Sequence, residues 1–246
     1  MAPAQAQSGD ATRVKRVLAI IPARGGSKGL PKKNVMPLLG RPMMQYTIDA
    51  ARATPLIDRI IVTTDDEEIA RVARECGAEV PFVRPNDLAT DLATTEATLQ
   101  HAVLWMDEHT DFHADVVVFM TINNLFRRHE WVHDAVERLL ADDTLDSVFV
   151  ANKTFKNYWR RNDGRFERLA GDIAYGSRQA REPLYREDTG IALATRADLI
   201  RQGIRVGSNV DIVAVDDERT GIDIHDAYDF WLAELVMKEW PMDREL

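Results

Sequence analysis

The chain has 246 residues, 45% of them hydrophobic, which is enough for one α/β domain with a buried core. Its 40 acidic residues outnumber 31 Lys and Arg residues, and the resulting net charge of −9 argues against nucleic-acid and acidic-membrane binding. No apolar run approaches the ~18 residues that a membrane span needs, and residues 1–13 lack the apolar segment of a secretory signal. We therefore expect a cytoplasmic protein with a loose N-terminal tail and a single domain over residues 14–246.

The sole cysteine, Cys76, excludes an intrachain disulfide and is interpreted as a small buried residue near a helix end. Positive charge is concentrated near the N-terminus, because residues 14–48 contain seven Lys or Arg residues and no acid. Any anion site is therefore expected in that part of the chain.

Apolar runs and helical patterns alternate along the first part of the chain. Residues 16–23 (RVLAIIPA) are continuously apolar, which is typical of a strand buried in a parallel sheet. A glycine-rich loop and a helix opened by Pro42 follow. Residues 59–65 (RIIVTTD) predict a second strand, and the next helix has acids in its first turn and Gly77 at its end.

The alternation continues through the middle of the chain. Residues 79–85 form a short extended piece, and Thr94 or Thr95 caps the helix that follows. Residues 115–121 and 146–153 predict strands on either side of a helix over residues 129–142. This order predicts a doubly wound α/β fold with a mostly parallel sheet, whose ligands bind at the carboxyl ends of the strands.

Residues 153–188 differ in character, because they are rich in Arg and aromatic side chains and contain a turn signal at residues 162–164. We interpret them as an insertion that carries a β-hairpin. The core pattern resumes at residues 190–200 and 211–217, and a strand-to-helix junction is expected within residues 220–240.

The sequence IPARGGSKGLPKKN, residues 21–34, is the strongest functional signal. Glycine allows the backbone to approach a ligand closely, and backbone N–H groups together with cationic side chains bind a triphosphate. Arg24, Lys28 and Lys33 are the natural phosphate partners. The loop matches neither the P-loop pattern nor G-x-G-x-x-G. The alternative is a surface turn with solvated lysines.

This loop, together with LLGRPMMQYTIDAA, IVTTDDEEIA, FVRPNDLATD and a late IDI, resembles the N-acylneuraminate cytidylyltransferase family. The resemblance runs from about Val17 to Glu234 and is poorest between Ile122 and Tyr185. It implies a Rossmann-like nucleotidyltransferase fold. It also implies an enzyme that couples CTP to a 2-keto-3-deoxy-ulosonic, sialic acid-like sugar acid and releases pyrophosphate.

The same resemblance implies roles for individual residues. Arg24 and Lys28 would hold the β- and γ-phosphates, Asn34 and Arg84 would lie near the base, and Thr94 or Thr95 would reach cytosine. The implied nucleotide-binding set is Ala23, Gly25, Gly26, Ser27, Lys33, Asn34, Arg84, Thr94 and Thr95, and the implied catalytic set is Arg24, Lys28 and Asp223.

The metal site is expected at GIDIHD, residues 221–226. If this segment is a strand, Asp223 and His225 project to the same side. The family usually has two carboxylates for Mg²⁺ here, although one carboxylate plus phosphate oxygens can suffice. We therefore predict Asp223 as a Mg²⁺ ligand. His225 departs from the family pattern and has several interpretations, namely a Mn²⁺ ligand, a contact to metal through water, a sugar contact or an exposed histidine without a role.

The sugar pocket is expected in two further segments. Where the family reads LQPTSPLR this chain reads FMTINNLFR, and the alternative is a simple turn. The insertion would add cations for the sugar carboxylate, although charged hairpins are more often solvated. The predicted set is Thr121, Asn123, Asn124, Arg127, Arg178, Gln179, Arg181 and Tyr185.

The insertion would also form a homodimer interface, which is expected to bury Phe155, Tyr158, Trp159 and Phe166. Two alternative functions are a nucleotidyltransferase for another acceptor or nucleotide, and a catalytically silent nucleotide-binding relative. The sequence identifies neither the sugar acid nor a general base.

Overall fold

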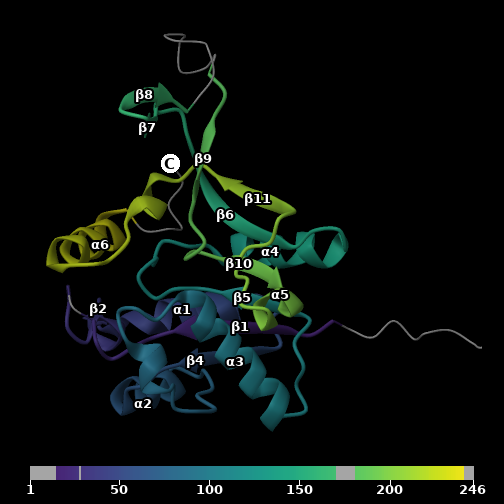
Figure 1. Cartoon of the computed structure of the whole chain (residues 1–246). Coiled ribbons are helices and arrows are strands. Elements are labelled where there is room, and N and C mark those ends of the chain that lie inside the picture. Colours follow the sequence, from purple (N-terminus) through teal and green to yellow (C-terminus); the bar gives the residue numbers. More distant parts are fainter. Residues whose placement is uncertain (1–14, 28, 170–180, 241–246) are drawn as a thin grey trace, which may run out of the picture.

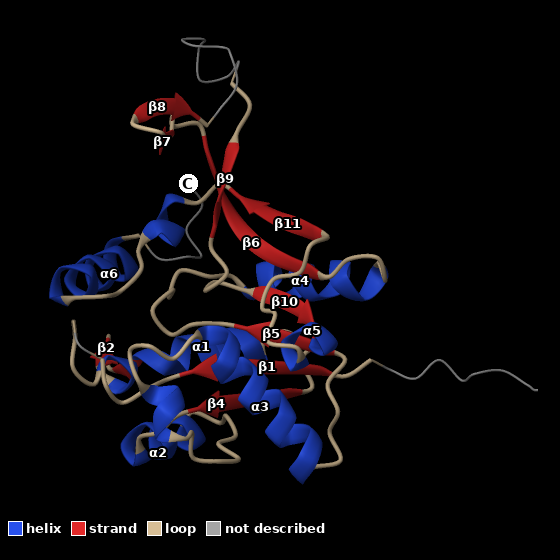
Figure 2. Cartoon of the chain, viewed as in Figure 1, coloured by secondary structure: helices blue, strands red, loops and turns tan. Residues whose placement is uncertain are grey.

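The computed structural model describes residues 15–27, 29–169 and 181–240. A seven-stranded sheet with the order β11-β6-β10-β5-β1-β4 forms its centre, and β9 also pairs with β6 (Figures 1 and 2). The strands are β1 (Val17–Pro22), β4 (Arg59–Thr63), β5 (Val116–Phe119), β6 (Ser147–Thr154), β9 (Leu184–Glu187), β10 (Leu193–Arg196) and β11 (Val210–Val215). β4, β1, β5, β6 and β11 share one direction, and β9 and β10 run opposite to them. The predicted mostly parallel sheet is confirmed.

Helices cover both faces of this sheet. They are α1 (Met43–Arg52), α2 (Glu67–Glu75), α3 (Thr95–His109), α4 (His129–Ala141), α5 (Ala197–Arg201) and α6 (Ala227–Glu239). Side chains alternate along a strand, so Ala19 and Ile21 of β1 pack with α1, α2 and α4, whereas Leu18 and Ile20 pack with α3 and α5. Because both faces are covered, residues 17–22 are apolar without interruption.

The smaller elements lie between the main ones. They are β2 (Pro37–Leu38), β3 (Arg41–Pro42), β7 (Trp159–Asn162), β8 (Arg165–Arg168) and the 3-10 turns η1 (Lys33–Val35), η2 (Asn86–Ala89) and η4 (Glu218–Gly221). No helix in the described part of the chain is both long and apolar enough to span a bilayer.

Capping residues fix where the helices begin. Thr94 caps α3 and accepts a hydrogen bond from Ala97 N at 3.1 Å. Asp226 caps α6 and forms a reciprocal capping box with Asp229. Both assignments follow the sequence signal of a short polar side chain just before an apolar periodic segment. Pro42 directly precedes α1, as predicted.

The predicted hairpin in the insertion is present as β7 and β8. Its turn has positive φ angles at Asp163 and Gly164, which is the geometry that an Asp-Gly pair favours. The segment that leaves the central sheet is shorter than the predicted insertion of residues 153–188, because Lys153 of β6 pairs with Tyr185 of β9. The hairpin is thus carried beyond a two-stranded extension of the main sheet, as Figure 1 shows.

Two expected extended segments are not strands. Residues 222–225 lie in a loop, because their apolar residue Ile224 is buried against the helical core and not beside another strand. Residues 79–85 form only an isolated bridge between Glu79 and Ile61. Cys76 is buried, as expected, and burial raises the pKa of its thiol.

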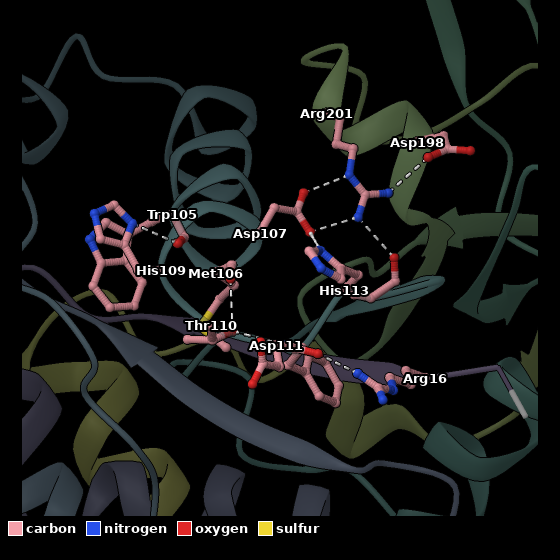
Figure 3. A network of polar contacts seen from close by, with 12 residues as sticks. Arg16, Trp105, Met106, Asp107, His109, Thr110, Asp111, His113, Asp198 and Arg201 are labelled. Atoms are coloured by element: carbon pink, nitrogen blue, oxygen red, sulfur yellow. Dashed lines mark hydrogen bonds and ion pairs between the residues drawn. The ribbon is translucent and has the colours of Figure 1, made fainter.

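A polar network fixes the end of α3 at the amino-terminal edge of the sheet (Figure 3). The Arg201 guanidinium donates to both carboxylate oxygens of Asp107, at 2.8 and 3.0 Å. Arg16, just before β1, donates to the carbonyl of Asp111 at 2.6 Å. This network joins α3, α5 and β1 at the edge opposite to the carboxyl ends, so we assign it a structural role.

A buried ion pair anchors the chain before the loop of residues 222–225. Arg219 donates to both carboxylate oxygens of Asp217, at 2.9 and 2.7 Å, and both residues are at most 5% exposed. Burial alone would raise the pKa of Asp217, but the hydrogen bonds from Arg219 outweigh it and lower the pKa. Asn152 of β6 donates to the Asp217 carbonyl at 2.6 Å, which ties this turn to the sheet.

Replacing Asp217 by Asn should lower the free energy of unfolding by about 3 kcal/mol at pH 7, because Arg219 would remain buried without its counter-charge. The lowered pKa means that the wild-type stabilisation is present above the unfolded pKa of about 4 and disappears as the pH falls through the folded value. Urea unfolding at pH 7 and at pH 3–5 measures both effects. The exposed neighbour provides the control, since Asp216→Asn should change stability by less than about 0.5 kcal/mol. Equal effects of the two variants would contradict this account.

Candidate active site

A pocket of about 330 Å³ opens where β1 and β5 end. It brings together the loop after β1, the turn after β5 and the loop before α6. Its lining residues are Pro22, Arg24, Ser27, Gly29, Leu30, Lys33, Asn34, Ile122, Asn123 and His225. The carboxyl ends of parallel strands are the usual ligand position in such sheets.

Backbone contacts hold the glycine-rich loop across the end of the sheet. Ala23 N donates to Thr63 O at 3.0 Å, and Gly25 N donates to Asp65 Oδ1 at 3.0 Å. The buried Asn34 side chain donates to Arg24 O at 3.0 Å and closes the loop on itself. The predicted nucleotide-binding residues of this loop therefore share one compact structure, in which Gly26 and Ser27 lie at the turn.

Gly29 lies where the glycine-rich loop meets the loop before α6. A Cβ atom at this position would lie only 2.4 Å from the carbonyl oxygen of His225, which is far closer than ordinary contact. The absence of a side chain therefore permits the two loops to approach, and the pocket depends on that approach. Lys28, the preceding residue, lies outside the described residues.

Arg24 is held at the mouth of the pocket by the η2 loop. Its guanidinium donates to the Thr90 carbonyl at 3.0 Å and forms an ion pair with Asp91 at 2.9 Å. The side chain is about one-third exposed, so an incoming anion can reach it. An anionic ligand would compete with Asp91 for this guanidinium.

Lys33 is a second cation of the pocket. Its ammonium group donates to the carbonyl oxygen of Ile224 at 2.5 Å. Burial lowers the pKa of Lys33, while the negative charges of Asp223 and Asp229 raise it and the positive charge of Arg24 lowers it. The Lys33 ammonium thus lies near two carboxylates and one guanidinium, and it could form an ion pair with an anionic ligand.

Asp223 and His225 come together, as predicted, although a loop and not a strand positions them. His225 Nε2 lies 2.8 Å from Asp223 Oδ2, and Asn123 donates its side-chain amide to Asp223 Oδ1. The backbone N–H of His225 donates to Asp229 Oδ2 at 2.8 Å. In the part of the chain that the structure describes, no group of three or more His, Cys, Asp or Glu side chains is arranged to hold a metal.

Of the residues predicted near the base, Asn34 lines the pocket, whereas Arg84, Thr94 and Thr95 do not. Arg84 is 4% exposed and donates from Nε to Thr63 Oγ1 at 3.1 Å. Burial lowers the pKa of its guanidinium to about 10, against the raising effect of Asp65. Thr94 and Thr95 form the start of α3, a few residues after the loop that holds Arg24. Their contacts with a base stay predictions.

Three of the predicted sugar-binding residues form a separate buried cluster. Thr121 donates its hydroxyl to Asn124 Oδ1 at 2.7 Å, and Arg127 donates to the carbonyl oxygens of Thr121 and Gly190 at 2.6 and 2.8 Å. Arg127 is 7% exposed, its Nε and Nη1 have no hydrogen-bond partner among the described residues, and burial lowers its pKa to about 9. In this arrangement the cluster joins the end of β5 to the β9–β10 connection, and of the segment TINNLFR only Ile122 and Asn123 line the pocket.

A second pocket, of about 510 Å³, lies at the base of the insertion. Arg181 lines it and donates to Phe155 O at 3.3 Å, whereas Tyr185 is exposed on β9. Its lining residues are Asn152, Lys153, Thr154, Phe155, Lys156, Tyr158, Arg181, Arg186, Asp216 and Glu218. Arg178 and Gln179 lie outside the described residues.

Sequence reasoning missed Arg186 as a site candidate. A side-chain hydrogen bond to Asp188 raises the pKa of Arg186, burial lowers it, and Asp223 is among the charges that raise it further. Arg186 therefore lies within the electrostatic field of the candidate metal ligand. Its position in a basic segment gave no signal that separated it from its solvated neighbours.

Comparison with known proteins gives one family model, described as cytidylyltransferase, which matches residues 18–198. The CMP-N,N'-diacetyllegionaminic acid synthase of Legionella pneumophila is 31% identical, over 91% of this chain and 97% of that protein. The pseudaminic acid cytidylyltransferase of Campylobacter jejuni is 45% identical over 86 residues, which cover 35% of this chain and 37% of that protein. A CMP:2-keto-3-deoxy-manno-octonic acid synthetase solved with CTP has a TM-score of 0.66 at 17% identity, over 92% of this chain and 99% of that one. This structural match shows the fold.

The pairing of Arg24 with Asp91 generates a prediction for triphosphate affinity. Asp91→Asn removes a competing carboxylate and should tighten CTP binding about two- to fivefold, the range expected for releasing an exposed ion pair. Isothermal titration calorimetry with CTP measures this change. Asp87→Asn removes the same charge from the same loop and serves as the control. Weaker binding by Asp91→Asn would show instead that Asp91 positions Arg24 for the ligand.

Proposed function

Because this chain belongs to the cytidylyltransferase family, we propose that it transfers the cytidylyl group of CTP to a 2-keto-3-deoxy-ulosonic, sialic acid-like sugar acid. The names of its relatives support this substrate class, since they activate legionaminic and pseudaminic acids. The products would be a CMP-sugar and pyrophosphate. We also propose a cytoplasmic location, where CTP is available.

One observation carries the proposal. A single pocket joins two cations, Arg24 and Lys33, with the loop that holds Asp223, at the carboxyl ends of β1 and β5. A triphosphate is bound by cations and backbone N–H groups, and a metal ion that acts on the phosphates needs a protein ligand close to them. The 330 Å³ pocket also lies within the volume range of small-molecule sites.

In the proposed reaction the anomeric hydroxyl at C2 of the sugar acid attacks the α-phosphorus of CTP. The new bond joins that oxygen to the α-phosphorus. The bond from the α-phosphorus to the oxygen that bridges to the β-phosphorus breaks, so that pyrophosphate leaves, and the hydroxyl proton passes to solvent. Arg24 and Lys28 would neutralise the charge that develops on the departing pyrophosphate. Catalysis would then consist mainly of positioning and charge neutralisation. We assign no general base.

We propose Asp223 as the ligand of a Mg²⁺ ion, with Mn²⁺ as an alternative. The Asp223 carboxylate is partly exposed beside the pocket, and the described residues provide no third protein ligand next to it and His225. This fits Mg²⁺, which commonly takes one or two carboxylates and completes its shell with phosphate oxygens and water. When bound, the metal supplies charge neutralisation at the phosphates.

We propose that the basic pocket at the base of the insertion contributes to recognition of the sugar carboxylate. Lys153, Lys156, Arg181 and Arg186 line it together, and a guanidinium can bind a carboxylate through two parallel hydrogen bonds. Arg186 also lies in the field of Asp223, which relates this pocket to the candidate metal ligand. The roles of Arg178 and Gln179 in the same segment stay predictions.

We propose a homodimer that uses the insertion. Trp159 and Phe166 on the hairpin are 54% and 68% exposed, and Tyr158 is 43% exposed. Helix α6 adds Tyr228 and Trp231, exposed by 65% and 54%. Large exposed aromatic side chains of this kind are typical of surfaces that protein interfaces bury.

A pyrophosphate-release assay tests the function. With Mg²⁺ and a panel of 2-ulosonic acids, CTP should support release, and ATP, GTP and UTP should not. Asp223→Asn should lower kcat about 100-fold or more while leaving CTP affinity within a few-fold, because the carboxylate is needed mainly where charge develops. Asp111→Asn, an exposed change at the opposite edge of the sheet, is the control. Release with another nucleotide, or none with any acid, would refute the proposed substrates.

The dimer has its own test. Wild-type protein should have the mass of a dimer in light scattering coupled to size-exclusion chromatography. The double variant Trp159→Glu and Phe166→Glu should have the mass of a monomer, because it would place two charges in the interface. Val83→Glu changes an exposed apolar residue outside the insertion and should remain dimeric. A dimer that persists in the double variant would exclude the hairpin from the interface.

A further inference from the structure

The two oxygens of the Asp223 carboxylate are held from two different parts of the chain. Asn123, in the turn after β5, donates its side-chain amide to Oδ1. His225, two residues after Asp223, places Nε2 at 2.8 Å from Oδ2. Each oxygen therefore has its own partner, and the plane of the carboxylate is fixed by both.

Backbone bonds fix the two partners in turn. Asn123 O accepts a hydrogen bond from Ile224 N at 3.1 Å, and the Ile224 side chain is fully buried. Ile224 O accepts the ammonium group of Lys33, and His225 N donates to Asp229. The side-chain contacts of Asp223 thus rest on a backbone arrangement that spans the glycine-rich loop, the turn after β5 and the start of α6.

The chemistry of the donors determines the direction of these bonds. An ionised carboxylate only accepts hydrogen bonds, so the hydrogen between Asp223 and His225 belongs to His225 Nε2. The Asn123 amide nitrogen is likewise a donor. Two donors thus converge on one anionic acceptor, and hydrogen bonds to an ionised group are about twice as strong as neutral ones.

We propose that Asn123 and His225 are paired positioning residues, which orient Asp223 for the metal–nucleotide complex. This inference rests on the proposed function, and it gives a joint role to two side chains that contact the same carboxylate. Each carboxylate oxygen has further lone pairs beyond the one that each donor uses. Asp223 therefore remains able to bind a cation while its rotation is restricted, and partners of this kind typically contribute 10- to 100-fold to metal affinity or activity.

The variant set separates this role from direct metal ligation by His225. In His225→Gln the amide nitrogen has a reach similar to that of Nε2 and donates a hydrogen bond, but an amide is a poor substitute for imidazole as a ligand. His225→Ala and Asn123→Ala each remove one donor. His129→Ala, an exposed histidine of α4 outside the pocket, is the matched control.

The first measurement is retention of Mn²⁺ by the full chain in the presence of CTP, followed by electron paramagnetic resonance of free Mn²⁺. His225→Ala and Asn123→Ala should each weaken retention about 10- to 100-fold, and His225→Gln should stay within about threefold of wild type. The second is pyrophosphate release, in which the two alanine variants should lower kcat with little change in the KM for CTP. In an Asp223→Asn background neither alanine substitution should have any further effect, because the group that they orient is gone.

The results distinguish this inference from the proposed function. Loss of retention in His225→Gln equal to that in His225→Ala would overturn the positioning role and indicate direct ligation. Three other results would also overturn it. The two alanine variants could retain Mn²⁺ as well as wild type does, or the alanine substitutions could have their full effect in the Asp223→Asn background. The third is that the wild-type protein retains no Mn²⁺. Normal Mn²⁺ and CTP binding without pyrophosphate release from any acid would refute only the proposed function. A misfolded Asn123→Ala protein, seen by circular dichroism, leaves the His225 variants to decide the question.

Discussion

The pocket depends on one buried backbone position, Ile224. Its N–H donates a hydrogen bond to Asn123 O in the turn after β5, and its carbonyl oxygen accepts one from Lys33 of the glycine-rich loop. Its side chain is buried in the hydrophobic core. Three segments that are far apart in the sequence meet at this residue. A loop without regular structure can therefore be as well fixed as a strand, because its backbone groups have defined partners and its apolar side chain is anchored.

Charge balance is the second organising constraint. The cations Arg24 and Lys33 line the pocket, the negative charges of Asp223 and Asp229 act on Lys33 from beside it, and Arg24 is further restrained by Asp91. Without a ligand these charges compensate one another within the protein. When an anionic ligand and a divalent cation bind together, the anion can pair with Arg24 and Lys33 and the cation with Asp223. No buried charge is then left without a partner of opposite sign.

The sequence predicted most of the fold, because the signals involved are local. The continuous apolar run of β1, the cap at Thr94 and the Asp-Gly turn of the hairpin each depend on a few adjacent residues. The prediction of a strand at residues 222–225 was wrong, because burial of a side chain does not by itself imply a strand. Alternation of apolar residues reports which side chains are buried, and Ile224 is buried against the core without a neighbouring strand.

Prediction of the site was less complete, because it depends on distant partners. Asn123 and Asn124 are adjacent and chemically identical, yet one contacts Asp223 and the other contacts Thr121. The choice is made by Asp223, 100 residues after Asn123, and by the position of Gly190 beside Asn124, which no local pattern encodes. The roles of Lys28, Arg178 and Gln179 stay predictions from sequence.

The two-stranded extension of the sheet has a consequence for how this protein family can change. Thr154 of β6 and Leu184 of β9 are paired, so the chain leaves the sheet and returns to it at adjacent points. The entropy of closing a loop between two such points grows only with the logarithm of its length. Residues 155–183 can thus be lengthened, shortened or exchanged as a cassette at small cost to the sheet. Evolution or a designer can alter what the insertion contacts while the nucleotide pocket, built on other strand ends, keeps its geometry.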